Sequence, residues 1–481
     1  MKTSRRDFLK SAATVTAAFS GLSRYASAQA PAGAGPGKYG PLVRDPKRIF
    51  DLPAGFKYKI IGRAGDYMDD GLRIPGRSDG MGTFPGEDGK TVLVRNHELE
   101  VDLTYEGPFG LENELFEKID RAKVYDPGKG IAPHIGGTTT VIFDTKTQTV
   151  EKQFLSLAGT CRNCAGGVTP WGSWITCEES VDKKGTAEEP DNHNEQHHGY
   201  PFEVPADPES GLVSPVPLKA MGRFNHEAVA VDPETGIVYQ TEDRHDGLFW
   251  RYIPKEPGKL AAGGRLQFLC ITDQVEQVKP NSKSAPTRAG VDARNWKDSK
   301  QRVEIGKPMS VEWKDIDDID SPDDDLRKRG YAEGGARFAR SEGIWFGDKE
   351  LYFACTNGGK TQHGQVFRYR PSDAEGTAGE AKNPGKLELF VEPNDKAILQ
   401  SADNLTIAPD GSVVVCEDGP RSPRIHYITP EGNIHVLGQN RYNDKELAGL
   451  CFSPDGSTLF VNIYDPGITL AITGPWTGGQ T

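Results

Sequence analysis

The chain has 481 residues, of which 36% are hydrophobic, and a formal net charge of −12 at pH 7. Its length suffices for a large core, and its negative charge disfavours nucleic acid and anionic membrane surfaces as partners. No segment reaches the roughly 18 consecutive apolar residues of a membrane-spanning helix, so we expect no stable membrane insertion.

The N-terminus has the features of a twin-arginine export signal. Ser4-Arg5-Arg6-Asp7-Phe8-Leu9-Lys10 precedes a weakly apolar stretch, and Ala26-Ser27-Ala28 matches an A-x-A cleavage site. We therefore predict a signal peptide over 1–28, read by the twin-arginine export machinery, and a periplasmic or secreted mature protein. Residues 29–50, rich in Gly and Pro, are expected to form a linker or entry arm, followed by a single catalytic domain over 51–475.

One pattern recurs along that domain: a short strand, a turn marked by Gly or Pro, and a second strand, with acidic or amide side chains at the outer ends. The clearest copy is 226–243, HEAVAVDPETGIVYQTED. The copies begin at residues 80, 166, 226, 342, 403 and 448. The shorter intervals suit a four-stranded blade of roughly 40–50 residues. The sequence therefore predicts an all-β fold, a six-bladed β-propeller with helical and loop insertions in the longer intervals.

Three insertions stand out. Residues 99–135 contain ELFEKIDRAKV, a possible helix, and 181–215 are polar and His-rich, which predicts a surface loop. Residues 272–335 form the longest insertion. Its acidic run from Asp315 to Asp325 lacks the spacing of a calcium loop and is expected to be solvated.

The acidic ends of the hairpins should meet. A hairpin places the start of its first strand beside the end of its second, so hairpins of one orientation bring these ends to one mouth of the channel. Carboxylates gathered there would repel one another unless cations compensate them, and oxygen ligands favour hard cations such as calcium. The pattern indicates a polynuclear metal site, and the alternative is that these acids only cap strand ends. The candidates are Asn96, Glu98, Glu178, Glu179, Glu227, Glu242, Asp243, Glu342, Asp403, Asn404, Glu417, Asp418 and Asn462.

Cysteine could add a softer ligand. The chain has seven cysteines, so they cannot all pair. Cys164 stands directly before a hairpin, near the predicted acidic mouth, where a thiolate among carboxylates would suit iron. The alternatives are a disulfide with Cys161 and plain burial. His97 and His226 each precede a candidate glutamate, and because neighbours in a strand point to opposite faces, we expect them to pack or to bond groups behind the ligands.

Arg340 lies two residues before Glu342 and should face the same side of the strand. Its planar guanidinium matches phosphate, which makes it a candidate substrate-binding residue. Arg244, directly after Asp243, also flanks the acids. The alternative for both is a salt bridge that neutralises the cluster.

Several short motifs contain the candidate residues: Arg95-Asn96-His97-Glu98, Asn163-Cys164-Ala165-Gly166-Gly167 through Thr176-Cys177-Glu178-Glu179, Phe224-Asn225-His226-Glu227, Glu242-Asp243, Arg340-Ser341-Glu342-Gly343 and Asp403-Asn404. With these motifs the chain resembles a known family, the PhoX-type alkaline phosphatases. The resemblance covers about residues 40–470 and includes the leader.

The resemblance implies a six-bladed propeller that holds two irons and three calciums bridged by an oxo group. It implies Cys164 as the iron-bridging thiolate and Arg340 as the phosphate-binding arginine. Glu227 and Glu342 would be the iron-side carboxylates. Further candidate ligands by resemblance are Glu98, Glu179, Glu242, Asp243, Asp403 and Glu417. The family also uses a lysine on phosphate, for which Lys307 and Lys314 lie in the right region but in no matching motif.

These features favour an exported, metal-dependent phosphoester hydrolase that acts as a monomer on a small phosphorylated substrate. Its cofactors would be iron and calcium, and Arg340 and Cys164 its catalytic residues. Two other hypotheses stay open. One is a calcium-dependent propeller lactonase or esterase with a histidine base such as His226 or His97. The other is a non-catalytic propeller in which calcium is structural.

Overall fold

The computed structural model describes residues 37–277 and 290–476, and the predicted signal peptide 1–28 lies outside them. The described residues are almost entirely strands, turns and loops, with one α-helix among them, α2 (Leu326–Ala332). No helix in these ranges is long and apolar enough to cross a membrane. The all-β prediction is confirmed.

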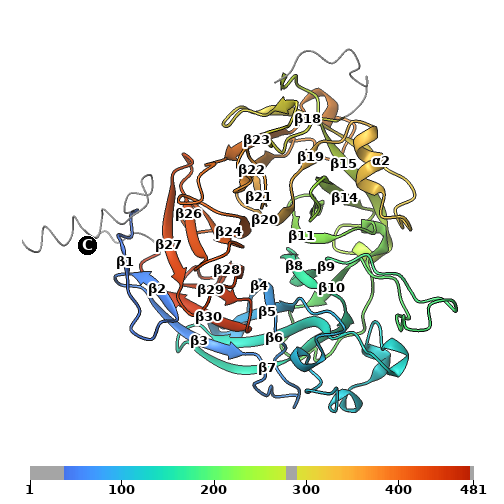
Figure 1. Cartoon of the computed structure of the whole chain (residues 1–481), viewed down its shortest axis with the longest axis vertical. Helices are drawn as coiled ribbons and strands as arrows, with labels where there is room; N and C mark the ends of the chain where they lie inside the picture. Colours follow the sequence, from blue (N-terminus) through green and yellow to red (C-terminus); the bar gives the residue numbers. More distant parts are fainter. Residues whose placement is uncertain (1–36, 278–289, 477–481) are drawn as a thin grey trace, which may run out of the picture.

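The sheets radiate from a common centre in a propeller-like arrangement (Figure 1). The innermost strand of each hairpin lies against the innermost strand of the next, and the last returns to the first. In this order the inner strands are β4 (Ser78–Pro85), β8 (Asn163–Val168), β11 (His226–Val231), β20 (Ser341–Phe346), β24 (Ala402–Ile407) and β28 (Leu447–Phe452).

Each inner strand continues outward through antiparallel pairing. β4 leads to β5 (Thr91–His97), β6 (Gly136–Asp144) and β7 (Thr149–Thr160), and β8 leads to β9 (Ser173–Glu178) and β10 (Pro201–Pro205). β11 leads to β12 (Val238–Glu242), β14 (Trp250–Pro254) and β15 (Gly264–Ile271), and β20 leads to β21 (Leu351–Cys355), β22 (Gln365–Arg370) and β23 (Lys386–Val391). β24 leads to β25 (Val413–Glu417), β26 (Arg424–Ile428) and β27 (Ile434–Asn440), and β28 leads to β29 (Thr458–Ile463) and β30 (Ile468–Thr473).

The two ends of the described chain close the ring. β3 (Lys57–Arg63) is the outer partner of β30, with Lys57 opposite Thr473. β1 (Leu42–Val43) and β2 (Phe50–Pro53) add to the outer edge of β27, with Phe50 opposite Asn440. Part of the predicted entry arm is therefore strand, and a sheet completed by the N-terminal segment ties the first and last hairpins together.

The insertions differ in part from the predictions. The helix predicted within 99–135 is wrong: the segment forms short 3-10 turns, including η3 (Phe116–Lys118) and η4 (Arg121–Lys123), because Ile119 and Asp120 between them are extended. Phe116 instead packs into an apolar cluster with Phe109. The long insertion contributes β16 (Glu276–Gln277), β17 (Gln301–Arg302), β18 (Met309–Asp315), which joins β15 to β23, and α2, and β13 (Gly247–Leu248) pairs with β19 (Arg337–Phe338).

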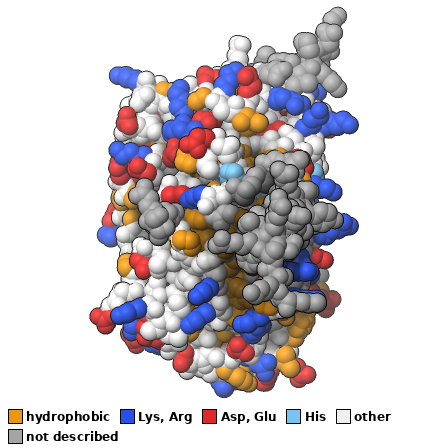
Figure 2. All heavy atoms as spheres, turned by 90° about the vertical axis from the view of Figure 1, so that its left-hand side faces the viewer, with side chains coloured by type: hydrophobic (Ala, Val, Ile, Leu, Met, Phe, Trp, Pro, Cys, Tyr) orange, Lys and Arg blue, Asp and Glu red, His pale blue; other side chains and the backbone are white. Residues whose placement is uncertain are grey.

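The core consists of apolar side chains packed between neighbouring sheets. Leu93 and Phe143 of the β4–β7 sheet, for example, pack with Cys451 and Phe460 of the β28–β30 sheet. On the outside, charged side chains of both signs are interspersed over the face in Figure 2. The acidic residues at the hairpin ends around the central channel belong neither to this core nor to this mixed surface.

Candidate functional site

The inner strands share one irregularity at their starts. In each, two residues stand opposite one residue of the second strand, as in a β-bulge, directly after the first pair or, in β28, after the second. Such bulges re-aim side chains and are frequent next to active sites. The first bulge residues are Asp79, Cys164, Glu227, Glu342 and Asp403, all lining one cavity, and Gly449 in β28.

Gly449 explains why β28 contributes no such side chain. Its φ is +69°, and a Cβ there would lie 2.2 Å from the backbone oxygen of Asp79. Only glycine allows the backbones of β28 and β4 to approach this closely. This sheet supplies Glu446 and Tyr464 to the cavity instead, from positions directly before β28 and directly after β29.

The second strands supply four further acidic side chains to the cavity by a simple alternation. In four of these strands the residue directly after the strand faces the cavity, and the last residue of the strand faces away from it, because neighbours point to opposite sides. The cavity-facing residues are Glu98 after β5, Glu179 after β9, Asp243 after β12 and Asp418 after β25.

The resulting cavity has a volume of about 240 Å³ and is strongly acidic. Nine carboxylates, one thiol, one phenol and only two basic side chains surround it. It is lined by Asp79, Glu98, Glu179, Glu227, Asp243, Glu342, Asp403, Asp418, Glu446, Cys164, Tyr464, Arg162 and Arg340.

Three sets of side chains in this cavity have the spacing of metal ligands. In each set the ligand atoms lie within 4.8 Å of one another. The sets are Cys164, Glu179 and Glu227; Glu227, Glu342 and Asp403; and Asp79, Glu98 and Glu446. Glu227 belongs to two sets, as a carboxylate between two neighbouring cations would.

The electrostatics of the cavity also call for cations. Burial, with the charge of Asp418 next, raises the pKa of Asp403 to about 8. Burial and neighbouring carboxylates likewise raise the pKa values of Glu227 and Glu342 well above their usual range. Burial raises the pKa of Cys164 as well. Cations would stabilise the ionised forms, and the donor set fits: sulfur with oxygen for iron, oxygen alone for calcium.

The two arginines border the cavity at corresponding places. Arg340 binds Asp243 through both Nε and Nη2, each at 2.9 Å, and its Nη2 lies 2.9 Å from Glu342 Oε1. Its Nη1 is 3.9 Å from Asp418, beyond hydrogen-bond distance. The expectation that Arg340 and Glu342 share a side is confirmed.

Arg162 repeats this arrangement two residues before Cys164. Its Nη2 donates to Glu98 Oε1 at 2.9 Å and also to Glu179. Both arginines have positive φ values, 47° at Arg162 and 53° at Arg340, and each immediately precedes an inner strand. About a third of each side chain is exposed, so both guanidinium groups are within reach of a ligand from solvent.

Three predicted ligands lie outside the cavity, bound to other partners. Glu178 accepts hydrogen bonds from His198 Nδ1 at 2.7 Å and from the backbone N–H of Cys161. Glu242 accepts from the Trp250 indole at 3.0 Å. Glu417 accepts from Arg424 and, at 2.9 Å, faces His426 Nε2.

The predicted amides lie behind the cavity. Asn96 donates to the carbonyl of Ala165 at 2.8 Å and accepts from the Trp174 indole. Asn404 donates to Asp403 Oδ1 at 2.9 Å and accepts from the N–H of Gly449. These contacts orient the bulged strands, and the amide side chains are not among those that line the cavity.

Sequence reasoning missed Asp79, Glu446, Arg162 and Tyr464. The sequence pattern predicts that the first hairpin begins at residue 80 and the last at 448, whereas β4 begins at Ser78 and β28 at Leu447. The spacing of Arg162 to Cys164 equals that of Arg340 to Glu342, and this signal was available in the sequence.

The histidines and cysteines mostly follow the predictions. His97 is buried and bonds Gly76 and Thr139, and His226 is buried and stacks on Phe224. All seven cysteines are free thiols, so the alternative of a Cys161–Cys164 disulfide is wrong. Lys314 lies near Glu312 and Glu333 and Lys307 near Glu304, and neither lines the cavity.

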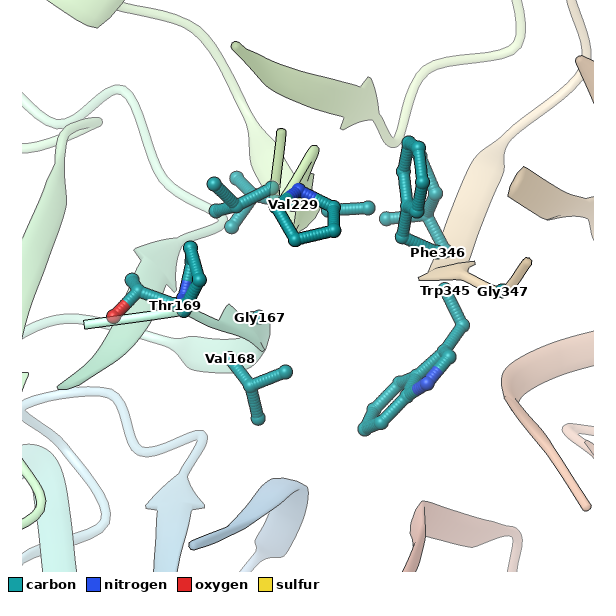
Figure 3. A pocket seen from close by; sticks show the side chains of 12 residues that line it. Gly167, Val168, Thr169, Val229, Trp345, Phe346 and Gly347 are labelled. Carbon is teal, nitrogen blue, oxygen red and sulfur yellow. The ribbon is translucent and has the colours of Figure 1, made fainter. Parts of the chain in front are cut away.

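The hairpin turns form a different surface. A depression of about 180 Å³ lies among the turns of β8–β9, β11–β12 and β20–β21. Figure 3 shows Val168, Val229, Trp345 and Phe346 around it. Acidic side chains therefore gather at one end of these hairpins and apolar side chains at the other.

Comparisons with known proteins agree with this architecture. The family model described as alkaline phosphatase PhoX matches residues 37–148 and 135–467. The structure of Pseudomonas fluorescens PhoX in complex with vanadate, a transition-state analogue, is similar with a TM-score of 0.63 and 17% identity, over 93% of this chain and 98% of that chain.

Other likenesses are weaker. Virginiamycin B lyase from Staphylococcus aureus has a TM-score of 0.39 and 11% identity, over 87% of this chain and 99% of that chain. A gluconolactonase from Xanthomonas campestris has a TM-score of 0.35 and 12% identity, over 90% of this chain and 100% of that chain. No curated protein sequence matches the chain.

Proposed function

Because this chain belongs to the alkaline phosphatase PhoX family, we propose that it is an exported phosphomonoester hydrolase whose active site is the acidic cavity at the channel mouth. The observation that carries the proposal is the cavity itself: nine carboxylates and a thiol face two arginines in about 240 Å³. Such a site binds cations and, through them and the arginines, an anionic substrate.

The cavity residues can be assigned to iron or to calcium by the atoms they offer. Cys164, Glu179 and Glu227 would hold iron, since a thiolate favours a transition metal. Glu342 and Asp403 with the shared Glu227, and Asp79, Glu98 and Glu446, would hold calcium, since they offer oxygen only. This differs from the iron-side role that the resemblance implies for Glu342, because Glu342 is not in the set that contains Cys164. Cations bound there would hold the phosphate oxygens and stabilise the negative charge that develops during hydrolysis.

Arg340 would bind the non-bridging oxygens of the phosphate. Its planar fork suits phosphate, and Asp243 and Glu342 fix its orientation before substrate arrives. Arg162 would act in the same way from the β8 side, held by Glu98 and Glu179. Two fixed guanidinium groups on a small cavity favour a monoester, whose terminal phosphate presents several oxygens, such as glycerol phosphate or a nucleotide.

Two further proposals concern the number of blades and the location of the protein. We propose six blades, since the inner strands β4, β8, β11, β20, β24 and β28 contact one another in a cycle and each begins its own hairpin. We propose export by the twin-arginine route and a periplasmic or secreted location, on the motif at residues 4–10.

A lactonase with a histidine base has less support. His97 and His226 are buried and bonded behind the strands, and no histidine is among the residues that line the cavity. A non-catalytic calcium propeller would not need the two arginines that border the cation ligands.

The test uses the exported mature protein, purified without chelator. Hydrolysis of p-nitrophenyl phosphate is compared with that of bis(p-nitrophenyl) phosphate and of a lactone, before and after chelation and after return of iron and calcium. We expect monoester hydrolysis that is lost on chelation and restored by the metals. Lactone hydrolysis, or metal loading with no turnover of any substrate, would contradict the proposal.

A further inference from the structure

A second set of ligand-type side chains lies outside the acidic cavity. Asp126, His134 and His198 are all buried, with exposed fractions of 0%, 1% and 0%. Each offers a ligand atom, and these atoms lie within 4.8 Å of one another. Asp126 and His134 come from the insertion between β5 and β6, and His198 comes from the loop between β9 and β10.

His134 carries a buried nitrogen without a partner. Its Nε2 lies 2.9 Å from Asn194 Oδ1, an acceptor, so Nε2 bears the hydrogen and Nδ1 bears the lone pair. Nδ1 is buried and makes no hydrogen bond in the part of the chain that the structure describes. Burying a lone pair without a donor is unfavourable, and a cation would satisfy it.

His198 is oriented as a metal-binding histidine usually is. Its Nδ1 lies 2.7 Å from Glu178 Oε1, and Glu178 is fixed in turn by the N–H of Gly199 at 2.8 Å. Its Nε2 points to Asp126 Oδ2 at 3.2 Å. A carboxylate behind one ring nitrogen is the common arrangement of a histidine that binds zinc through its other nitrogen.

Asp126 is held by its loop and keeps capacity for a cation. Oδ1 accepts from the N–H of Gly128 at 2.9 Å, and both oxygens accept from the N–H of Glu195. Oδ2 also accepts from the N–H of Gln196. The contact of Oδ2 with His198 is the one that a cation would replace.

We propose that Asp126, His134 and His198 bind a zinc-class divalent cation, through Asp126 Oδ2, His134 Nδ1 and His198 Nε2. On binding, the proton between His198 and Asp126 leaves to solvent, and the cation takes its place. Two nitrogens and one oxygen are ligands that zinc accepts, with a fourth position left for water.

The site has an entry path and a structural consequence. His134 and Asn194 line a polar cleft of about 410 Å³, through which a hydrated cation can reach them. The cation would fasten the 191–198 loop to the 121–135 insertion. Through Glu178 it would also brace the end of β9, where the next residue, Glu179, enters the acidic cavity.

The test measures zinc and cobalt binding to the full mature protein. The test variant is His134→Phe, which removes the ligand nitrogen and keeps an aromatic ring beside His198, where the ring centroids of His134 and His198 are 4.3 Å apart. The control variant is His197→Ala, which removes a histidine of the same loop that is not in the set. After dialysis with Zn²⁺, we expect one more zinc per chain in wild type and His197→Ala than in His134→Phe. With Co²⁺ we expect the intense visible absorption of a four-coordinate ion in the first two proteins only.

Equal zinc content and equal cobalt spectra in all three proteins would overturn the proposal. If His134→Phe fails to fold, wild-type crystals soaked in Zn²⁺ decide instead. An anomalous peak at about 2.0–2.1 Å from the nitrogens of His134 and His198 supports the site. No peak there, with zinc present elsewhere in the crystal, overturns it.

Discussion

Two rows of acidic side chains, one residue apart in the sequence, have different surroundings in this protein. The outer row consists of acids that end a second strand, and the cavity row consists of the acids that directly follow them. Glu417 ends β25, is buried away from the cavity, and is paired with Arg424 and His426. Asp418 follows it and lines the cavity. Glu178 and Glu179, and Glu242 and Asp243, divide in the same way.

The difference separates stability from function. In the outer row Glu178 and Glu417 accept hydrogen bonds on both oxygens, so the fold satisfies their charge. Glu242 is the exception, because only its Oε2 has donors and burial raises its pKa to about 7.

In the cavity row Glu179 and Asp243 accept from Arg162 and Arg340. The cavity still holds nine carboxylates against these two cations, and burial raises the pKa of Asp403, beside the row, to about 8. A protein gains no stability from such a cluster unless a ligand compensates it, so the cavity row is where a ligand is expected.

The largest effect should come from Glu227→Gln. Glu227 belongs to two ligand sets, so its loss disturbs two cation positions at once. We expect the catalytic rate to fall at least about 10³-fold, or ~4 kcal/mol. The rate with p-nitrophenyl phosphate measures it, and a loss below tenfold would show that Glu227 is not a shared ligand.

Arg340→Ala should come next, with a loss of about 10²- to 10³-fold in kcat/KM, or ~2.7–4 kcal/mol, since it removes a fixed donor to the phosphate. Arg244→Ala is the matched control, because Arg244 flanks the acids and does not line the cavity. Similar losses in both variants would mean that the cavity needs positive charge in general and not Arg340 in particular.

Glu417→Gln should destabilise the fold by about 3 kcal/mol, because it leaves Arg424 and His426 with a weaker partner. Asp418→Asn should leave the free energy of unfolding nearly unchanged. Urea unfolding compares the two. If Asp418→Asn is the more destabilised, the two rows do not divide as described.

The lowered pKa of Glu417 predicts that the protein loses stability at acid pH. Burial alone would raise the pKa of Glu417, but His426 and Arg424 lower it from 4.5 to about 2. A lowered folded pKa means that the stabilisation is complete above pH 4.5 and is lost as the pH falls through about 2. Wild type should therefore lose its stability advantage over Glu417→Gln across that range, as urea unfolding at each pH will show.

Asp403 in the cavity should give the opposite pH dependence of stability in the metal-free protein. Because the folded pKa of Asp403 is about 8, stability is highest where this group is protonated and falls as the pH rises. Asp403 alone should cost about 2 kcal/mol between pH 6 and pH 8. Thermal unfolding of chelated protein measures this, and added calcium should reverse it. A chelated protein more stable at pH 8 would contradict it.

The smallest effect should come from Tyr464→Phe. The Tyr464 hydroxyl donates to Glu98 Oε2 at 2.7 Å, and its loss removes one hydrogen bond of about 1 kcal/mol. We expect calcium affinity to fall about fivefold with the iron content unchanged, measured by calcium titration. A loss of iron would contradict the assignment of Glu98 to a calcium position.

Much of this site could be predicted from the sequence, and the limits have physical causes. The repeated strand–turn–strand pattern gives the hairpins and brings Glu227, Glu342 and Asp403 to one mouth. Which acid of a neighbouring pair faces the cavity depends on the bulge and the pairing register, which no local pattern reveals. Asp79 and Glu446 were missed because strand ends are uncertain by a few residues.

Metal content tests the central claim most directly. Iron and calcium are measured by elemental analysis in exported wild type, Cys164→Ser and Cys161→Ser, all purified without chelator. Cys161 is the matched control, since it is buried three residues away and does not line the cavity. We predict both metals in wild type and Cys161→Ser, and loss of iron in Cys164→Ser. Wild type without iron, or iron unchanged in Cys164→Ser, would contradict the assignment of the cavity as an iron and calcium site.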